Sequence, residues 1–161
     1  MQNLQQMLQQ GGQGAKAVEY TALQALLPDI AGWEKGEADG EQGEMMGVSY
    51  ARTEASYNRG DVNVKLEIID TALIQAMVMP FSMMARGGFN EKSDEGYKRG
   101  TTINGNPGWE EWEHQTQSGD VNVLVANRFI VHASGHDLPN LDPIRAVVTA
   151  VPAARLAALV K

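Results

Sequence analysis

The chain contains no cysteine, so it can form no disulfide, cysteine thiolate nucleophile or cysteine-ligated zinc site. Basic residues are also few, because 13 Lys and Arg stand against 20 Asp and Glu and give a formal net charge of -7. Proteins that neutralise phosphate backbones need clustered lysine and arginine. The composition therefore argues against a nucleic-acid partner.

The chain also lacks a long hydrophobic run. Its longest nearly uncharged stretch, residues 71–85, is shorter than the roughly 20 apolar residues that cross a bilayer, so we expect no transmembrane span. The N-terminus shows no basic region followed by an apolar stretch. We therefore expect that any secretion signal lay upstream of Met1 and was removed, or that an initiating Met1 replaced it.

The composition changes after the first 17 residues. Residues 1–17 are rich in Gln and Gly and have no aromatic side chain, which predicts a flexible tether. The rest of the chain carries enough of the 43% hydrophobic residues to form a core. We expect residues 18–161 to form one domain.

A six-residue phrase occurs twice, as Arg59-Gly60-Asp61-Val62-Asn63-Val64 and as Ser118-Gly119-Asp120-Val121-Asn122-Val123. In each copy a polar turn precedes alternating apolar positions, which is typical of a hairpin that enters a strand. We interpret the copies as equivalent hairpins in two halves of one fold. Although Arg59-Gly60-Asp61 matches an adhesive tripeptide, the second copy has serine instead of arginine, which favours a structural turn.

Hydrophobic periodicity and turn residues predict the order of elements. We expect strands at residues 33–42, 46–57, 61–70, 98–103, 109–115, 121–126 and 129–133. We expect helices within residues 18–32 and 71–86, a helix that begins at Asp142-Pro143, and a last helix after Pro152. This predicts an α+β fold in which helices cover an antiparallel sheet of about seven strands, built from two β-β-β(-β)-α halves.

Six segments of turns and apolar strands are spaced along the chain: Tyr20 to Pro28, Gly32-Trp33, residues 57–64, Gly96-Tyr97, Gly119 to Val123, and Arg128 to Val131. With these segments, residues 1 to 160 resemble uncharacterised bacterial envelope lipoproteins. The resemblance implies a periplasmic or outer-surface location and a lipid anchor on a cysteine upstream of the chain. This chain lacks that cysteine, and a true start at Met1 would instead favour the cytoplasm.

The expected order of elements is also similar to the PsbP-like α/β/α sandwich. Members of that family often act as assembly or accessory factors in envelope and thylakoid complexes. This second resemblance implies a non-catalytic accessory function, since fold likeness alone does not assign chemistry.

Metal ligation finds little support in the sequence. Five acids lie within eleven residues, namely Glu34, Glu37, Asp39, Glu41 and Glu44. They could hold calcium, but they do not follow the EF-hand pattern. His132 and His136 supply only two zinc ligands and are separated by Gly135. Four methionines, Met77, Met79, Met83 and Met84, could bind Cu(I). Because the residues around them are apolar, we expect them to lie in the core. We expect no metal and no other cofactor.

Catalytic patterns are similarly weak. No Gly-x-Ser-x-Gly elbow occurs, and Ser134 to Asp137 are contiguous, whereas triad residues are assembled from separate elements. The glycine-rich segment 36–43 is acidic and has no Walker lysine. An enzyme that uses His114 or His132 with nearby acids remains an alternative.

Aromatic and methionine side chains are the best candidates for partner contact. Trp109 and Trp112 must point to opposite faces of a regular strand, so we expect one core ring and one exposed ring. Met83 and Met84 are a second candidate contact, with protein or lipid.

These observations favour a non-catalytic accessory or interaction domain that is tethered in the bacterial envelope and binds a protein. One alternative is a carrier or sensor of a small apolar ligand held between the sheet and the methionine-rich helix. The other is the histidine-dependent enzyme, which would be hydrolytic.

Overall fold

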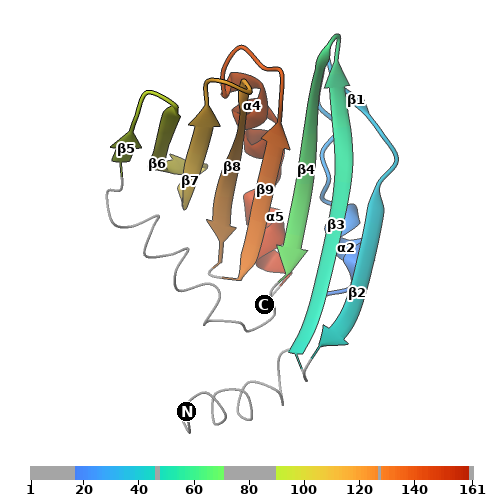
Figure 1. Ribbon diagram of the computed structural model, residues 1–161. Coiled ribbons are helices and arrows are strands. Elements are labelled where there is room, and N and C mark those ends of the chain that lie inside the picture. The colour runs from blue at the N-terminus through green and yellow to red at the C-terminus, as the bar shows by residue number, and fades with distance from the viewer. Residues whose placement is uncertain (1–16, 46–47, 71–89, 127, 160–161) are drawn as a thin grey trace, which may run out of the picture.

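The computed structural model describes residues 17–45, 48–70, 90–126 and 128–159. Nine strands in these ranges form one antiparallel sheet (Figure 1). The strands are β1 (Glu34–Lys35), β2 (Asp39–Met45), β3 (Val48–Arg59), β4 (Val62–Asp70), β5 (Asn90–Lys92), β6 (Gly96–Ile103), β7 (Asn106–Glu113), β8 (Ser118–Val125) and β9 (Phe129–Gly135). Their spatial order is β1-β3-β4-β9-β8-β7-β6-β5, and β2 pairs with β3 beyond the end of β1.

The α+β class and the antiparallel sheet agree with the sequence prediction, but the number of strands does not. The predicted strand 33–42 is interrupted at Gly36, whose N–H donates to the Ser56 carbonyl at 2.7 Å, and it becomes β1 and β2. β5 was not predicted because its three residues are polar and exposed and show no apolar alternation.

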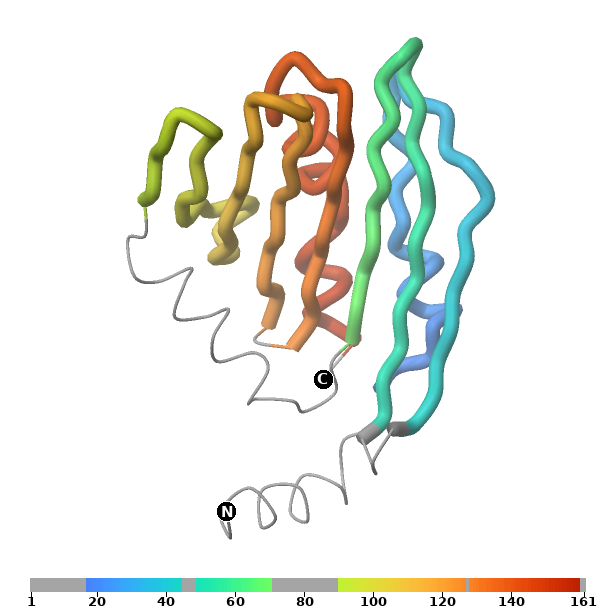
Figure 2. The backbone as a smooth tube through the Cα atoms, in the orientation of Figure 1, coloured from blue at the N-terminus to red at the C-terminus, as the bar shows by residue number. Residues whose placement is uncertain are grey.

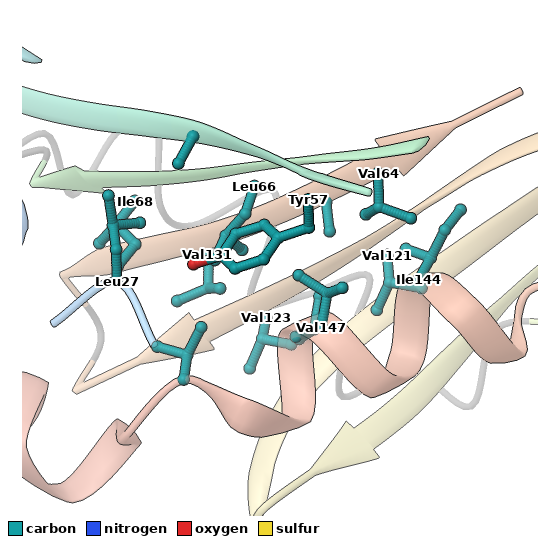
Figure 3. Close-up of a cluster of buried hydrophobic side chains, with 14 of the residues drawn as sticks. Leu27, Tyr57, Val64, Leu66, Ile68, Val121, Val123, Val131, Ile144 and Val147 are labelled. Atoms are coloured by element: carbon teal, nitrogen blue, oxygen red, sulfur yellow. The ribbon is translucent and has the colours of Figure 1, made fainter. Parts of the chain in front are cut away.

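One face of the sheet is covered by helices α2 (Tyr20–Gln24), α4 (Asp142–Ala150) and α5 (Ala153–Ala158), which lie behind the sheet in Figure 1. Alternate residues of the central strands point to these helices and are buried, including Leu66, Ile68 and Val131. Figure 3 shows Tyr57 within this core, and its hydroxyl donates to the Pro28 carbonyl at 2.7 Å. We refer to this side of the sheet as the helical face.

Prolines set the C-terminal helix boundaries where the sequence predicts them. Pro143 lies in the first turn of α4, and Ile144, Val147 and Val148 bury one side of the helix. Pro152 lacks the N–H that would continue α4 and stands at the N-cap of α5. Within the predicted helical segment 18–32, only the five residues of α2 are α-helical.

Two buried carboxylates on the helical face are held by arginines. Glu110 is 1% exposed and accepts hydrogen bonds from Arg99 and Arg145, the latter at 2.7 and 2.8 Å. Burial by itself would raise the pKa of Glu110, but the hydrogen bonds from both arginines outweigh burial and lower this pKa. Asp70 accepts from Arg128 at 2.7 and 2.8 Å.

The β3–β4 hairpin extends past its neighbours. Val64 lies opposite Gly135, and Gly135 lies opposite Gly119, so residues 60–63 continue beyond the end of β9. Figure 2 shows this hairpin reaching past the β7–β8 turn. The two copies of the repeated phrase therefore occupy different positions relative to the sheet.

The predicted helix at 71–86, with Met77, Met79, Met83 and Met84, lies outside the described residues, and so does the tether up to residue 16. None of the helices in the described part of the chain is both long and apolar enough to cross a bilayer.

Candidate binding face

The sheet face opposite the helices carries a row of polar side chains. The strand register places Glu54, Glu67, His132 and Asn122 side by side on β3, β4, β9 and β8. The next row toward the β3–β4 turn contains Lys65, Ser134, Asp120 and Glu111. We call these eight residues, together with Arg52, the polar face.

Ion pairs join the β2–β4 side of the polar face. Arg52 lies 3.3 Å from Glu41, 3.5 Å from Glu54 and 3.4 Å from Glu67. Lys65 Nζ lies 3.0 Å from Glu54 Oε2. The cations on this side thus lie among carboxylates of the same surface, and the side chains are held across three strands.

A second polar cluster joins β8 and β9. His132 Nε2 lies 3.4 Å from Asp120 Oδ2, which also accepts a hydrogen bond from Asn122 Nδ2 at 2.9 Å. Burial would raise the pKa of Asp120, but hydrogen bonds from His132 and Asn122 lower it below its usual 3.8. Asp120 therefore remains ionised across the physiological pH range.

A surface depression of about 630 Å³ lies over this cluster. Among the described residues that line it, those with charged or titratable side chains are Lys65, Glu111, Glu113, Asp120, His132 and His136. Three carboxylates and one ammonium give this lining a net charge of -2 when both imidazoles are neutral. The depression is open to solvent and offers both hydrogen-bond donors and acceptors.

Toward the opposite end of the strands the same face becomes apolar. Leu124 and Ile130 are 2% and 8% exposed, and Ile69 packs against them. The register puts Ile69, Ile130 and Leu124 in the row next to Glu67, His132 and Asn122. On β4, β9 and β8 the polar side chains therefore give way to apolar ones in this row, whereas on β3 Arg52, which lies opposite Ile69, continues the polar face.

The His132–Asp120 contact is not part of a serine triad. Ser134 pairs with Asp120 in the strand register, yet among the described contacts it makes no hydrogen bond to His132. His114 lies in the β7–β8 turn, and its Nδ1 accepts from Trp112 Nε1 at 3.1 Å. The contacts therefore give His114 and His132 different partners.

The sequence prediction for the tryptophans is partly confirmed. Trp109 and Trp112 do point to opposite faces of β7, with Trp112 in the helical-face core. The expectation that one ring is exposed is wrong, because they are 7% and 8% exposed. Alternation predicts which face a side chain takes, but does not predict what covers that face.

The histidine and carboxylate metal candidates that the structure describes form no cluster. His136 lies 3.1 Å from Asp137, and both are exposed. Within the described ranges, no group of three potential His, Cys, Asp or Glu ligands is present. The acids at 34, 37, 39, 41 and 44 lie along the β1–β2 edge, where Glu41 pairs with Arg52.

Sequence reasoning missed most of the polar face. The sequence predicts Asp120 and Asn122 only as parts of the repeated phrase. It does not predict Arg52, Glu54, Lys65 or Glu67 as binding residues. Their spacing of two residues within β3 and β4 was a usable signal, because it places charged side chains on one face of each strand.

The described core leaves little empty space for a ligand. The gap between the sheet and the α4–α5 region, lined in part by Val123, Val131 and Val148, has a volume of about 10 Å³. That is about the space of a single water molecule. The space beside the predicted methionine-rich helix lies outside the described residues.

No protein-family model, curated protein or solved structure matches this chain.

Proposed function

We propose that this chain is a non-catalytic interaction domain of the bacterial cell envelope that binds a protein partner through the polar face. The single observation that carries the proposal is the ordered arrangement of charged and amide side chains across β3, β4, β9 and β8, next to an open depression. Arranged charges of this kind suit specific protein association, because they select partners and set the register of docking.

The position of the chain's N-terminal part supports a tethered arrangement. Ala17 N–H donates to Ser49 Oγ at 2.9 Å, and Val18 N–H donates to Asp70 Oδ2 at 2.7 Å. Asp70 ends β4, whereas the depression lies near the start of that strand, at Asn63 and Lys65. A tether that joins the domain at residue 17 would leave the depression at the far end of β4, accessible to a partner.

Site-specific photo-crosslinking in the native envelope tests the proposal. A photoreactive amino acid at Glu111, which is exposed and lines the depression, should give a discrete adduct with a partner protein. The matched control is the same amino acid at Ala146, an exposed position on α4 behind the sheet. Equal adducts from both positions, or none from Glu111, would contradict the proposal.

A further inference from the structure

His132 occupies the centre of the polar face. Its register neighbours are Glu67 on β4 and Asn122 on β8, and its Nε2 faces Asp120 Oδ2 at 3.4 Å. The side chain is 32% exposed and so reaches solvent, while its partner Asp120 also accepts a hydrogen bond from Asn122. His132 thus belongs to a cluster with Asp120 and Asn122.

The other charged groups around His132 come from five strands. They comprise Lys65 and Glu67 on β4, Asp120 on β8, Glu54 on β3, Glu111 on β7 and Lys98 on β6. Histidine is the side chain whose ordinary charge change falls between about pH 5 and pH 8. Protonation of His132 therefore adds one positive charge to the lining of the depression, next to Asp120.

Asp120 is the carboxylate of the polar face that contacts His132. Its partners are His132 and Asn122, and Asn122 is neutral. With His132 neutral, Lys98 is the cation that still acts on Asp120, and Glu111, which lies between Lys98 and Asp120 in the strand register, adds a second negative charge. With His132 protonated, the imidazolium itself neutralises Asp120 at 3.4 Å.

We propose that the polar face binds a lysine- or arginine-bearing segment of its partner at Asp120, and that protonation of His132 releases it. This inference rests on the proposed function and adds the chemistry of the partner and its control by pH. The partner's cation and the imidazolium compete for one carboxylate, so binding is strong near neutral pH and weak in acid. His136 contributes less, because it and Asp137 are largely exposed and solvent screens their charges.

The test uses an acetylated tetralysine peptide as the probe and the full chain as the receptor. Nuclear magnetic resonance follows the Asn122 side-chain amide, which reports on Asp120 directly. The dissociation constant should be roughly tenfold larger at about pH 5.5 than at about pH 7.5. His132→Gln should bind with little dependence on pH, whereas the matched variant His136→Gln should keep most of the dependence.

Asp120→Asn provides a second variant that does not rely on replacing the histidine. It should bind the probe about as weakly at neutral pH as the unaltered chain does in acid. Persistence of the pH dependence in His132→Gln would overturn the inference, and so would absence of probe binding near Asn122 at both pH values. Either result would leave the crosslinking outcome at Glu111 unaffected, so failure of this inference is distinguishable from failure of the proposed function.

Discussion

The two copies of Gly-Asp-Val-Asn-Val lead into β4 and β8, but the glycine of each copy has a different role. Gly60 lies in the β3–β4 turn with φ +60°, and a Cβ there would meet no atom within 4 Å. Gly119 lies inside β8, where a Cβ would be 2.5 Å from the Glu111 carbonyl oxygen and 2.6 Å from Leu141 Cδ2. One glycine supplies backbone freedom and the other supplies space.

The aspartate and asparagine of the two copies also differ in their surroundings. Asp61 and Asn63 are exposed near the tip of the protruding hairpin, where Asn63 donates to Asn58. Asp120 and Asn122 lie within the sheet and bond to each other on the polar face. The repeat therefore predicts strand and facing, while the neighbouring strands decide what each residue does. The following variants test this difference in pairs, from the largest expected effect to the smallest.

Alanine at the two glycines should separate the copies most strongly. Gly119→Ala should lower the free energy of unfolding by about 3 kcal/mol, because the new methyl group collides with the backbone of β7. Gly60→Ala should cost about 1 to 2 kcal/mol, because alanine is strained at positive φ but has free space. Urea unfolding measures both values, and equal losses would mean that the two glycines have the same role.

Alanine at the two asparagines should give a smaller difference. Asn122 is 7% exposed and donates to Asp120, so Asn122→Ala should lower the free energy of unfolding by about 1 to 3 kcal/mol. Asn63→Ala removes an exposed contact and should change it by less than about 0.5 kcal/mol. Thermal unfolding of both variants checks the contrast, which disappears if Asn122 is replaced without loss.

The two aspartates should differ mainly in their dependence on pH. The folded pKa of Asp120 is lowered, so its contribution to stability is present above its usual pKa of 3.8 and is lost as the pH falls below that value. Asp120→Asn should therefore cost about 1 kcal/mol at neutral pH and progressively less in acid.

Asp61→Asn is the matched control for this measurement. Asp61 is exposed in the hairpin turn, so the variant should follow the unaltered chain at every pH. Urea titrations across the acid range give both curves. The free energies of unfolding of Asp120→Asn and the unaltered chain should converge in acid. A constant difference down to the most acidic condition would contradict a lowered pKa of Asp120 in the folded state.

The sequence was sufficient for features that depend on local chemistry. Pro143 and Pro152 define α4 and α5 because proline lacks an N–H and fixes φ. Alternation in β4 predicts that Val64, Leu66 and Ile68 share a buried face, and all three are fully buried. Both signals act within a few residues, which is why one sequence reveals them.

Features that depend on strand register could not be derived in this way. Arg52, Lys65, Asp120 and His132 come from four strands, and only the pairing of β3, β4, β9 and β8 brings them onto one surface. A slip of one residue in any pair would move a whole strand's side chains to the other face. The short polar β5 and the burial of Trp109 likewise depend on neighbours distant in the chain.

The carboxylate of Asp70 also has a mechanical consequence. It accepts hydrogen bonds from the Val18 N–H and from the Arg128 guanidinium, while the adjacent Ala17 N–H donates to Ser49 at the start of β3. A pulling force applied through residue 17 would therefore be divided among β3, β4 and the turn that precedes β9. Load shared by three neighbouring strands strains several bonds at once, so the sheet should resist extension from its N-terminal end better than a single peeled strand would.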